Sequence, residues 1–107
     1  MEYKLFLDTN ALLNLQSAAF KEKFVISQKT LEEIESIKTS GHKDGDVKYK
    51  ARSIARLLDK SENYEVIAYT QEVRKVINEF TLDETPDNII LASAYWYNQS
   101  SSIIVCT

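Results

Sequence analysis

Short runs of apolar residues alternate along the chain with segments in which apolar side chains recur every three or four positions. The apolar runs have the length of β-strands and cover residues 3–7, 24–26, 64–68 and 102–106. The intervening periodicity predicts helices over 10–15, 28–38 and 47–58, another capped by Thr70, and a last one opened by Thr85–Pro86. Both glycines fall within residues 40–45, which we expect to form a loop.

Strands separated by helices predict an α/β fold with a central, mainly parallel sheet of about four strands. Helices then cover both faces of the sheet, which gives three layers. Connections between parallel strands are right-handed. Each crossover helix runs antiparallel to its strands, so it begins at the carboxyl edge of the sheet. Ligands bind at that edge in open α/β folds. Residues that end strands or begin helices are therefore the candidates for chemistry.

Acidic residues from distant parts of the chain are expected at this edge. Asp8 directly follows the first strand, and Asp87 lies in the first turn of the last helix. At about 100° per residue, Asp87 projects toward the buried side of its helix. The helix after the second strand carries three further acids early in its length. On its wheel Glu32 lies opposite the apolar stripe, while Glu33 and Glu35 flank the stripe, and periodicity does not choose between these two.

Carboxylates that converge at one edge repel each other, by about 4 kcal/mol for two charges 4 Å apart at an effective dielectric of 20. A hard cation with oxygen ligands removes this repulsion, and Mg²⁺ or Mn²⁺ fits that description. Each acid also has an ordinary interpretation. Asp8 is a suitable N-cap, the glutamates suit a solvated first turn, and Asp87 suits a plain helix start. The joint placement at one edge is what favours a metal site.

Composition narrows the class of protein. The chain has 107 residues, 44% of them hydrophobic, which suits a single globular domain. Its formal net charge is −3, so binding a nucleic acid requires a local basic patch. Cys106 is the one cysteine, which predicts a cytoplasmic protein without internal disulfides. No stretch has the roughly 18 apolar residues of a membrane span, and we expect no membrane partner.

One helix carries a local basic stripe of Lys48, Arg52 and Arg56 at successive i, i+4 positions. The stripe is a candidate for following an RNA backbone beside the acidic pocket. The alternative is a solvated helix face offset by Asp44 and Asp59. The aromatic residues 95–97 are expected to pack either in the core or in a subunit interface. The second alternative would make the protein a homodimer.

Three segments resemble the motifs of PIN-domain nucleases, the family named for the PilT N-terminus. Leu7-Asp8-Thr9-Asn10 is similar to the opening motif, Leu31-Glu32-Glu33-Ile34 to the second acidic motif, and residues 87–94 to the third. Residues 105–107 are similar to the start of a fourth motif, in which an aspartate follows the threonine. The segments 31–38 and 45–58 are most similar to PIN domains found alone or fused to PhoH-type ATPases.

The resemblance implies a metal-dependent endoribonuclease. Asp8, Glu33 and Asp87 would be the catalytic carboxylates and hold Mg²⁺ or Mn²⁺, and Thr9, Asn10 and Thr107 would orient them or a water. Activated water would attack single-stranded RNA in line and leave a 5′-phosphate and a 3′-hydroxyl. The partners implied are an antitoxin, if the protein is the toxin of a toxin–antitoxin pair, or a fused ATPase domain. We expect residues 1–107 to be one PIN-like domain that lacks its C-terminal end, with an incomplete metal site.

Two other classes of protein were compared with this expectation. A non-catalytic PIN-like module would bind RNA or a protein without cleaving RNA. A phosphoacceptor receiver domain would need an acidic pair near the end of the first strand and a lysine late in the sheet. Here a single acid ends that strand and no lysine follows Lys75, so the receiver domain is disfavoured.

Overall fold

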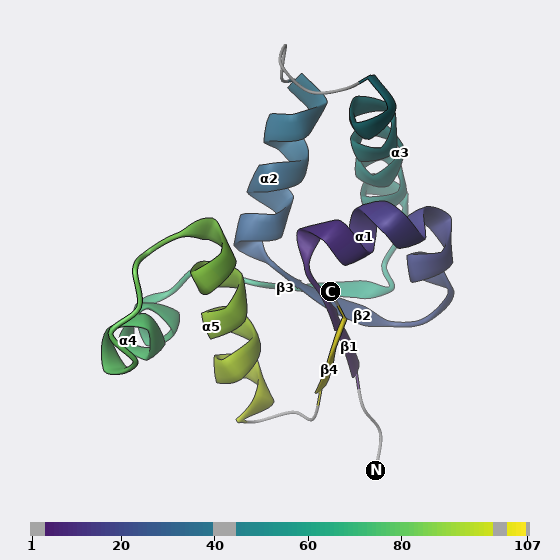
Figure 1. Ribbon diagram of the computed structural model, residues 1–107. Helices are drawn as coiled ribbons and strands as arrows, with labels where there is room; N and C mark the ends of the chain where they lie inside the picture. Colours follow the sequence, from purple (N-terminus) through teal and green to yellow (C-terminus); the bar gives the residue numbers. More distant parts are fainter. Residues whose placement is uncertain (1–3, 40–44, 100–102, 107) are drawn as a thin grey trace.

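A computed structural model of the chain describes residues 4–39, 45–99 and 103–106. Its centre is a sheet of four strands, β1 (Lys4–Leu7), β2 (Phe24–Ser27), β3 (Tyr64–Ile67) and β4 (Ile103–Cys106), in the order β3-β2-β1-β4 (Figure 1). Every pairing is parallel. The predicted parallel α/β sheet is confirmed, and the predicted strands agree closely with those observed.

Five α-helices and one 3-10 helix connect the strands within the described residues. They are α1 (Thr9–Leu15), η1 (Gln16–Lys21), α2 (Gln28–Thr39), α3 (Gly45–Lys60), α4 (Gln71–Glu79) and α5 (Pro86–Asn98). Thr70 caps α4 as predicted, and α5 opens at Thr85–Pro86 as predicted, with Thr85 as its cap. Each threonine accepts a hydrogen bond from a backbone N–H. The 3-10 helix was not predicted, because its residues lack helical apolar periodicity. Gly45 begins α3 instead of ending a loop, and the rest of the predicted loop lies outside the described residues.

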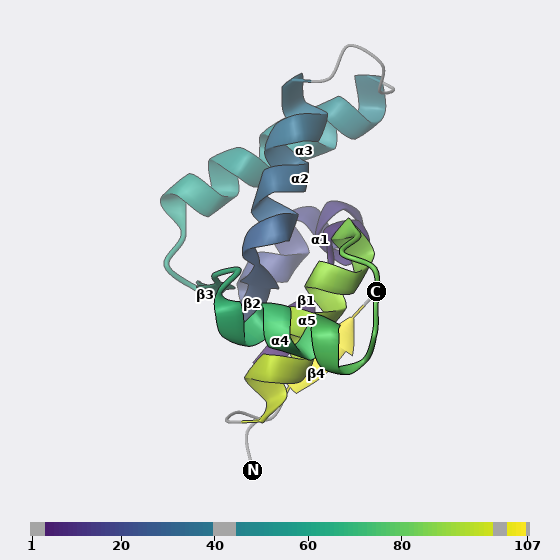
Figure 2. The ribbon, with the colours of Figure 1, turned by 90° about the vertical axis from the view of Figure 1, so that its left-hand side faces the viewer.

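Two hydrophobic cores, one on each face of the sheet, hold the three layers together. Successive strand residues point to opposite faces, so Leu7 belongs to one core and Phe6 to the other. The first core contains the apolar residues of α1, α2 and α3, and the second contains those of α4 and α5. The helix pair α2 and α3 extends well beyond the sheet (Figures 1 and 2). Among the helices that the structure describes, none has both the length and the apolar character needed to cross a membrane.

The strand order creates a crevice between β1 and β4. From β1 the chain proceeds outward to β2 and β3, and then returns to place β4 on the other side of β1. Ligands in open α/β folds bind outside the carboxyl ends of the strands at such a reversal of direction. Asp8 follows β1 at this point.

Candidate functional site

A pocket of about 350 Å³ lies at the carboxyl end of the β1–β4 crevice, and two of the predicted acids line it. Asp8 enters the pocket from the end of β1, and Asp87 from the first turn of α5. The other lining residues are Phe6, Asn10, Asn88, Ile90, Leu91, Ala94 and Val105. Two residues nearly eighty positions apart in sequence thus share one small site, as the topology predicted.

Asp8 is held in place by its own helix. Its backbone is extended, at φ −82° and ψ 178°, and its Oδ1 accepts a hydrogen bond from the Ala11 N–H at 2.8 Å. Asp8 is therefore the N-cap of α1. The second carboxylate oxygen makes no hydrogen bond to the described part of the chain, so capping leaves it able to bind a ligand.

Asp87 lies at the rim of the pocket and is exposed, whereas the helical wheel placed it on the buried side. The predicted direction of the Asp87 side chain is correct, because Ile90 and Ala94 on the same face of the helix also line the pocket. The predicted burial is wrong, because the first turn of α5 lies at the edge of the sheet. The buried residues of this helix begin at Ile89.

Glu33 does not line this pocket, but it is tied to the residue that follows Asp8. The hydroxyl of Thr9 donates a hydrogen bond of 2.6 Å to Glu33 Oε1. Glu33 is half-buried, whereas Glu32 and Glu35 are exposed. Glu35 instead pairs with Lys38 on its own helix, at 3.1 Å. Of the three candidate glutamates, Glu33 is the one directed toward the start of α1.

A chain of buried hydroxyls supports the Thr9–Glu33 contact. Thr9 Oγ1 lies 3.3 Å from Thr30 Oγ1, which in turn lies 3.3 Å from Ser27 Oγ. A hydroxyl carries a single proton, so if Thr9 donates to Glu33, Thr30 must donate to Thr9 and Ser27 to Thr30. Ser27 and Thr30 are both fully buried, at 0% exposure. This chain was not predicted, although Ser27 at a strand end, three residues before Thr30, is a helix-capping pattern.

The segment before α5 is anchored by a second polar network. Glu84 accepts hydrogen bonds from the Tyr69 hydroxyl and from Arg74, whose guanidinium lies over the Tyr69 ring. The hydrogen bond from Tyr69 and then that from Arg74 hold the pKa of Glu84 below its usual value. Asn88 adds a bond from its side chain to the Asp83 carbonyl, at 2.9 Å. These contacts fix the start of the helix that carries Asp87.

Asn10 and Asn88 bring amide groups to the pocket beside the two acids. Asn10 was predicted to orient carboxylates or a water, and its position in the lining is compatible with that role. Asn88 was missed, because nothing in the sequence indicates that the third residue of this helix faces a ligand. Thr107, the remaining predicted member of the site, lies outside the described residues.

The donor set fits a hydrated ion better than a fully protein-bound one. Within residues 4–39, 45–99 and 103–106, no three histidine, cysteine or acidic side chains lie close enough together to hold a metal. Mg²⁺ commonly keeps several waters and is bound through one or two carboxylates. Asp8 and Asp87 in one pocket supply those two carboxylates. Glu33 stands nearby with its carboxylate engaged by Thr9.

The basic stripe lies elsewhere than expected. Lys48, Arg52 and Arg56 line a groove between α2 and α3, and that groove shares no lining residue with the pocket of Asp8 and Asp87. The structure therefore places the stripe on a different surface from the acidic pocket. The stripe lies on α3, whereas β1, α1, β4 and α5 form the pocket.

A family model described as a PIN domain matches residues 5–107, almost the whole chain. Comparison with curated proteins and with solved structures finds no significant match.

Proposed function

Since the chain belongs to the PIN-domain family, whose members are generally nucleases that use divalent metals, we propose that it is a metal-dependent ribonuclease. The observation that carries this proposal is the placement of Asp8 and Asp87 in one pocket at the carboxyl end of the β1–β4 crevice. An ion bound there would be Mg²⁺ or Mn²⁺, because the donors are oxygens and the pocket has room for retained waters.

Each residue then has a defined task. Asp8 and Asp87 would hold the ion, and the capping bond from Ala11 fixes the rotamer of Asp8. Thr9 holds Glu33, the third acidic member, in one orientation. Asn10 orients a water or a phosphate oxygen. When bound, a divalent ion would supply a more acidic water and would neutralise charge on the phosphoryl group. Hydrolysis joins the water oxygen to phosphorus and breaks the bond to the 3′ oxygen, which leaves a 5′-phosphate and a 3′-hydroxyl.

The test is cleavage of end-labelled single-stranded RNA by the purified chain in Mn²⁺. Asp8→Asn is the informative change, because asparagine caps a helix as well as aspartate does and removes only the charge. We expect Asp8→Asn and Asp87→Asn each to lower the cleavage rate by more than about 100-fold, the upper range for groups that merely support a metal ligand. An unchanged rate in either variant would show that the site is assigned wrongly.

Glu33→Gln and Glu35→Gln form a matched pair on one helix. Glutamine at position 33 should lower the cleavage rate, and glutamine at position 35 should leave it unchanged, because Glu35 is exposed and bound to Lys38. If the two variants changed the cleavage rate equally, Glu33 would not be a member of the site.

A non-catalytic module that binds RNA or a protein is the alternative. The observation that favours it is the lack, in the described part of the chain, of three metal-binding side chains in one cluster. RNA binding that persists in EDTA, with no cleavage in Mg²⁺ or Mn²⁺, would support the module and overturn the ribonuclease.

A further inference from the structure

The helix pair α2 and α3 forms a groove of about 640 Å³ that is lined mainly by cations. Lys48, Arg52 and Arg56 enter it from α3, and Lys38 enters it from the last turns of α2. Asp59 is the acid in its lining, and Thr39 and Ala55 complete it. The chain as a whole carries a formal charge of −3, so this groove concentrates positive charge on a protein that is otherwise acidic.

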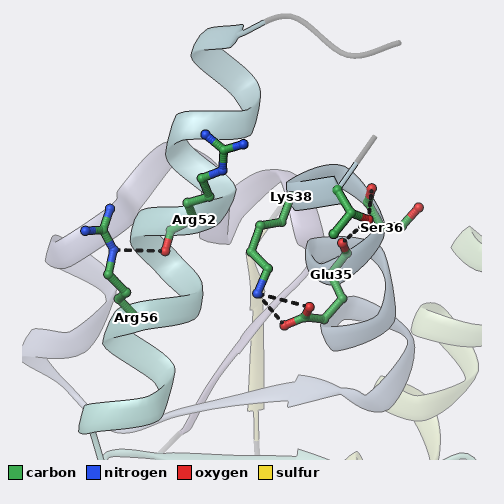
Figure 3. Close-up of polar contacts among 6 residues, drawn as sticks. Glu35, Ser36, Lys38, Arg52 and Arg56 are labelled. Carbon is green, nitrogen blue, oxygen red and sulfur yellow. Dashed lines mark hydrogen bonds and ion pairs between the residues drawn. The ribbon is translucent and has the colours of Figure 1, made fainter. Parts of the chain in front are cut away.

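The cations are available to a ligand. Figure 3 shows Arg52 and Arg56 one turn apart on α3, with Lys38 opposite them on α2. The Arg56 Nε donates a long hydrogen bond of 3.5 Å to the Arg52 carbonyl, and both arginines are exposed. Lys38 is shared with Glu35 at 3.1 Å. Within the residues that the structure describes, neither arginine forms an ion pair with a carboxylate, although Asp59 also lines the groove.

Spacing along α3 suits a linear polyanion. Residues four apart on a helix are separated by a rise of about 6 Å and a rotation of about 40°, so Lys48, Arg52 and Arg56 form a gently winding track of evenly spaced charges. A track of this kind can follow successive phosphates of one strand. It is a poorer match for the irregular distribution of acids on a folded protein.

An exposed aromatic lies on the same side of α3 as the arginines. Tyr49 is 63% exposed, and at about 100° per residue it lies about 60° from Arg52 and about 20° from Arg56 around the helix. A positively charged groove beside an exposed aromatic ring is the arrangement that binds single strands, with phosphates in the groove and a base stacked on the ring. Bases within a duplex are already stacked and do not offer that face.

We propose that the α2–α3 groove, with Tyr49, binds single-stranded nucleic acid through its phosphates and one stacked base, independently of the Asp8–Asp87 pocket. This deepens the proposed ribonuclease function and rests on it for the choice of RNA as the natural ligand. The groove would retain the strand while the pocket cleaves it. Because phosphates are contacted and base edges are not, binding is expected to tolerate most sequences.

Binding is measured by fluorescence anisotropy of a labelled single-stranded RNA of mixed sequence, in EDTA and over a range of salt. The double variant Arg52→Ala/Arg56→Ala should bind more weakly, and its plot of log affinity against log salt should be shallower by about 1.4, at about 0.7 per lost phosphate contact. The matched control is Lys75→Ala, which removes an exposed cation from α4. Tyr49→Leu should weaken binding by about fivefold or more, and Tyr49→Phe should not.

Three results would overturn the proposal. One is an Arg52→Ala/Arg56→Ala variant that binds RNA no differently from Lys75→Ala. Another is tighter binding of duplex than of single-stranded RNA. The third is competition by polyglutamate as effective as that by RNA, which would assign the groove to an acidic protein. A single-stranded DNA of the same sequence shows whether the ribose hydroxyl contributes.

The two proposals fail separately. Anisotropy in EDTA needs no cleavage, so a groove that binds RNA in a chain that never cleaves it would support this inference and refute the nuclease. The opposite outcome has two parts: Asp8→Asn loses cleavage, and Arg52→Ala/Arg56→Ala binds RNA as tightly as the wild type. That outcome would support the nuclease and refute the groove.

Discussion

Asp8 combines a structural role with its proposed role in binding a metal. One carboxylate oxygen accepts a hydrogen bond in the first turn of α1, and the residue lines the pocket that Asp87 also lines. Capping contributes about 0.5–2 kcal/mol to stability at such positions, and it also prevents the side chain from rotating away from the pocket. For this reason Asp8→Ala would confound stability with function, whereas Asp8→Asn separates them.

Thr30 is predicted to position Glu33 through Thr9. Thr30→Val keeps the volume of the side chain but removes the hydroxyl between Ser27 and Thr9, both buried. We expect a loss of about 1–3 kcal/mol in unfolding free energy from the unpaired hydroxyls, and about tenfold weaker Mn²⁺ binding. Urea unfolding and calorimetric titration with Mn²⁺ measure the two effects.

Thr30→Ser is the control that separates packing from positioning. Serine restores the hydroxyl and deletes a methyl group, so it should lose about 1 kcal/mol of stability while keeping the wild-type affinity for Mn²⁺. If valine and serine at this position bind Mn²⁺ equally well, the hydroxyl chain does not position Glu33.

At the scale of single residues, the sequence could indicate which segments carry candidate site residues. It could not show which of several neighbouring acids belongs to the site. Glu33 and Glu35 flank the apolar stripe of α2 symmetrically, so their wheel positions are equivalent. What distinguishes them is Thr9 on another helix, which lies within 2.6 Å of Glu33. The motif resemblance favoured Glu33, and the geometry gives a physical reason for that choice.

Helices and strands were the most predictable level. Apolar periodicity and capping residues located nearly every element, because each amphipathic segment buries one face against the sheet. The 3-10 helix at 16–21 is the exception. Ala19 is its one buried residue, so the segment shows no apolar stripe. Its first residue, Gln16, has a positive φ of 49°, which the sequence does not indicate because the residue is not glycine.

The segment that leads into α5 should respond to pH through Glu84. Its pKa in the folded protein lies below the usual value near 4.5, through Tyr69 first and Arg74 second. A lowered folded pKa means that this carboxylate stabilises the fold above the unfolded pKa, and that the contribution is lost as pH falls through the folded value. Glu84→Gln should therefore lower Tm by at most a few degrees at pH 7, since the pair is exposed.

Thermal unfolding of wild type and Glu84→Gln from pH 7 down to pH 3 measures this effect. The difference in Tm should shrink as pH falls below 4.5, because the wild-type carboxyl becomes protonated and resembles glutamine. Glu79→Gln, an exposed acid in the last turn of α4, is the control and should show no such convergence. A Tm difference that is constant with pH would mean that the charge of Glu84 does not anchor this segment.

The arrangement of whole elements was the least predictable from sequence. The parallel sheet and the meeting of Asp8 with Asp87 followed from topology, because the carboxyl ends of parallel strands share one edge. The position of the basic stripe did not follow. Lys48, Arg52 and Arg56 are local in sequence, but which neighbour they face depends on how α3 packs against α2. Only the folded molecule shows that Lys38 completes the groove and that the acidic pocket is separate.

Metal binding at the Asp8–Asp87 pocket should stabilise the whole molecule, because the pocket exists only when β1, β4 and α5 are assembled. A ligand that binds the folded state alone adds about 1.4 kcal/mol at ten times its Kd. For a domain of this size that corresponds to a rise in Tm of roughly 6–11 °C. Differential scanning fluorimetry with Mn²⁺ measures the rise, and EDTA should reverse it.

The same pair of acids makes this stabilisation specific. Asp8→Asn and Asp87→Asn each remove one of the two pocket carboxylates, so the rise in Tm should nearly vanish in both. Glu35→Gln should keep it, because that residue lies outside the pocket. An equal rise in all three variants would place the bound ion elsewhere on this acidic chain. Because this measurement needs neither RNA nor cleavage, it tests the metal site even if the chain proves to be a binding module.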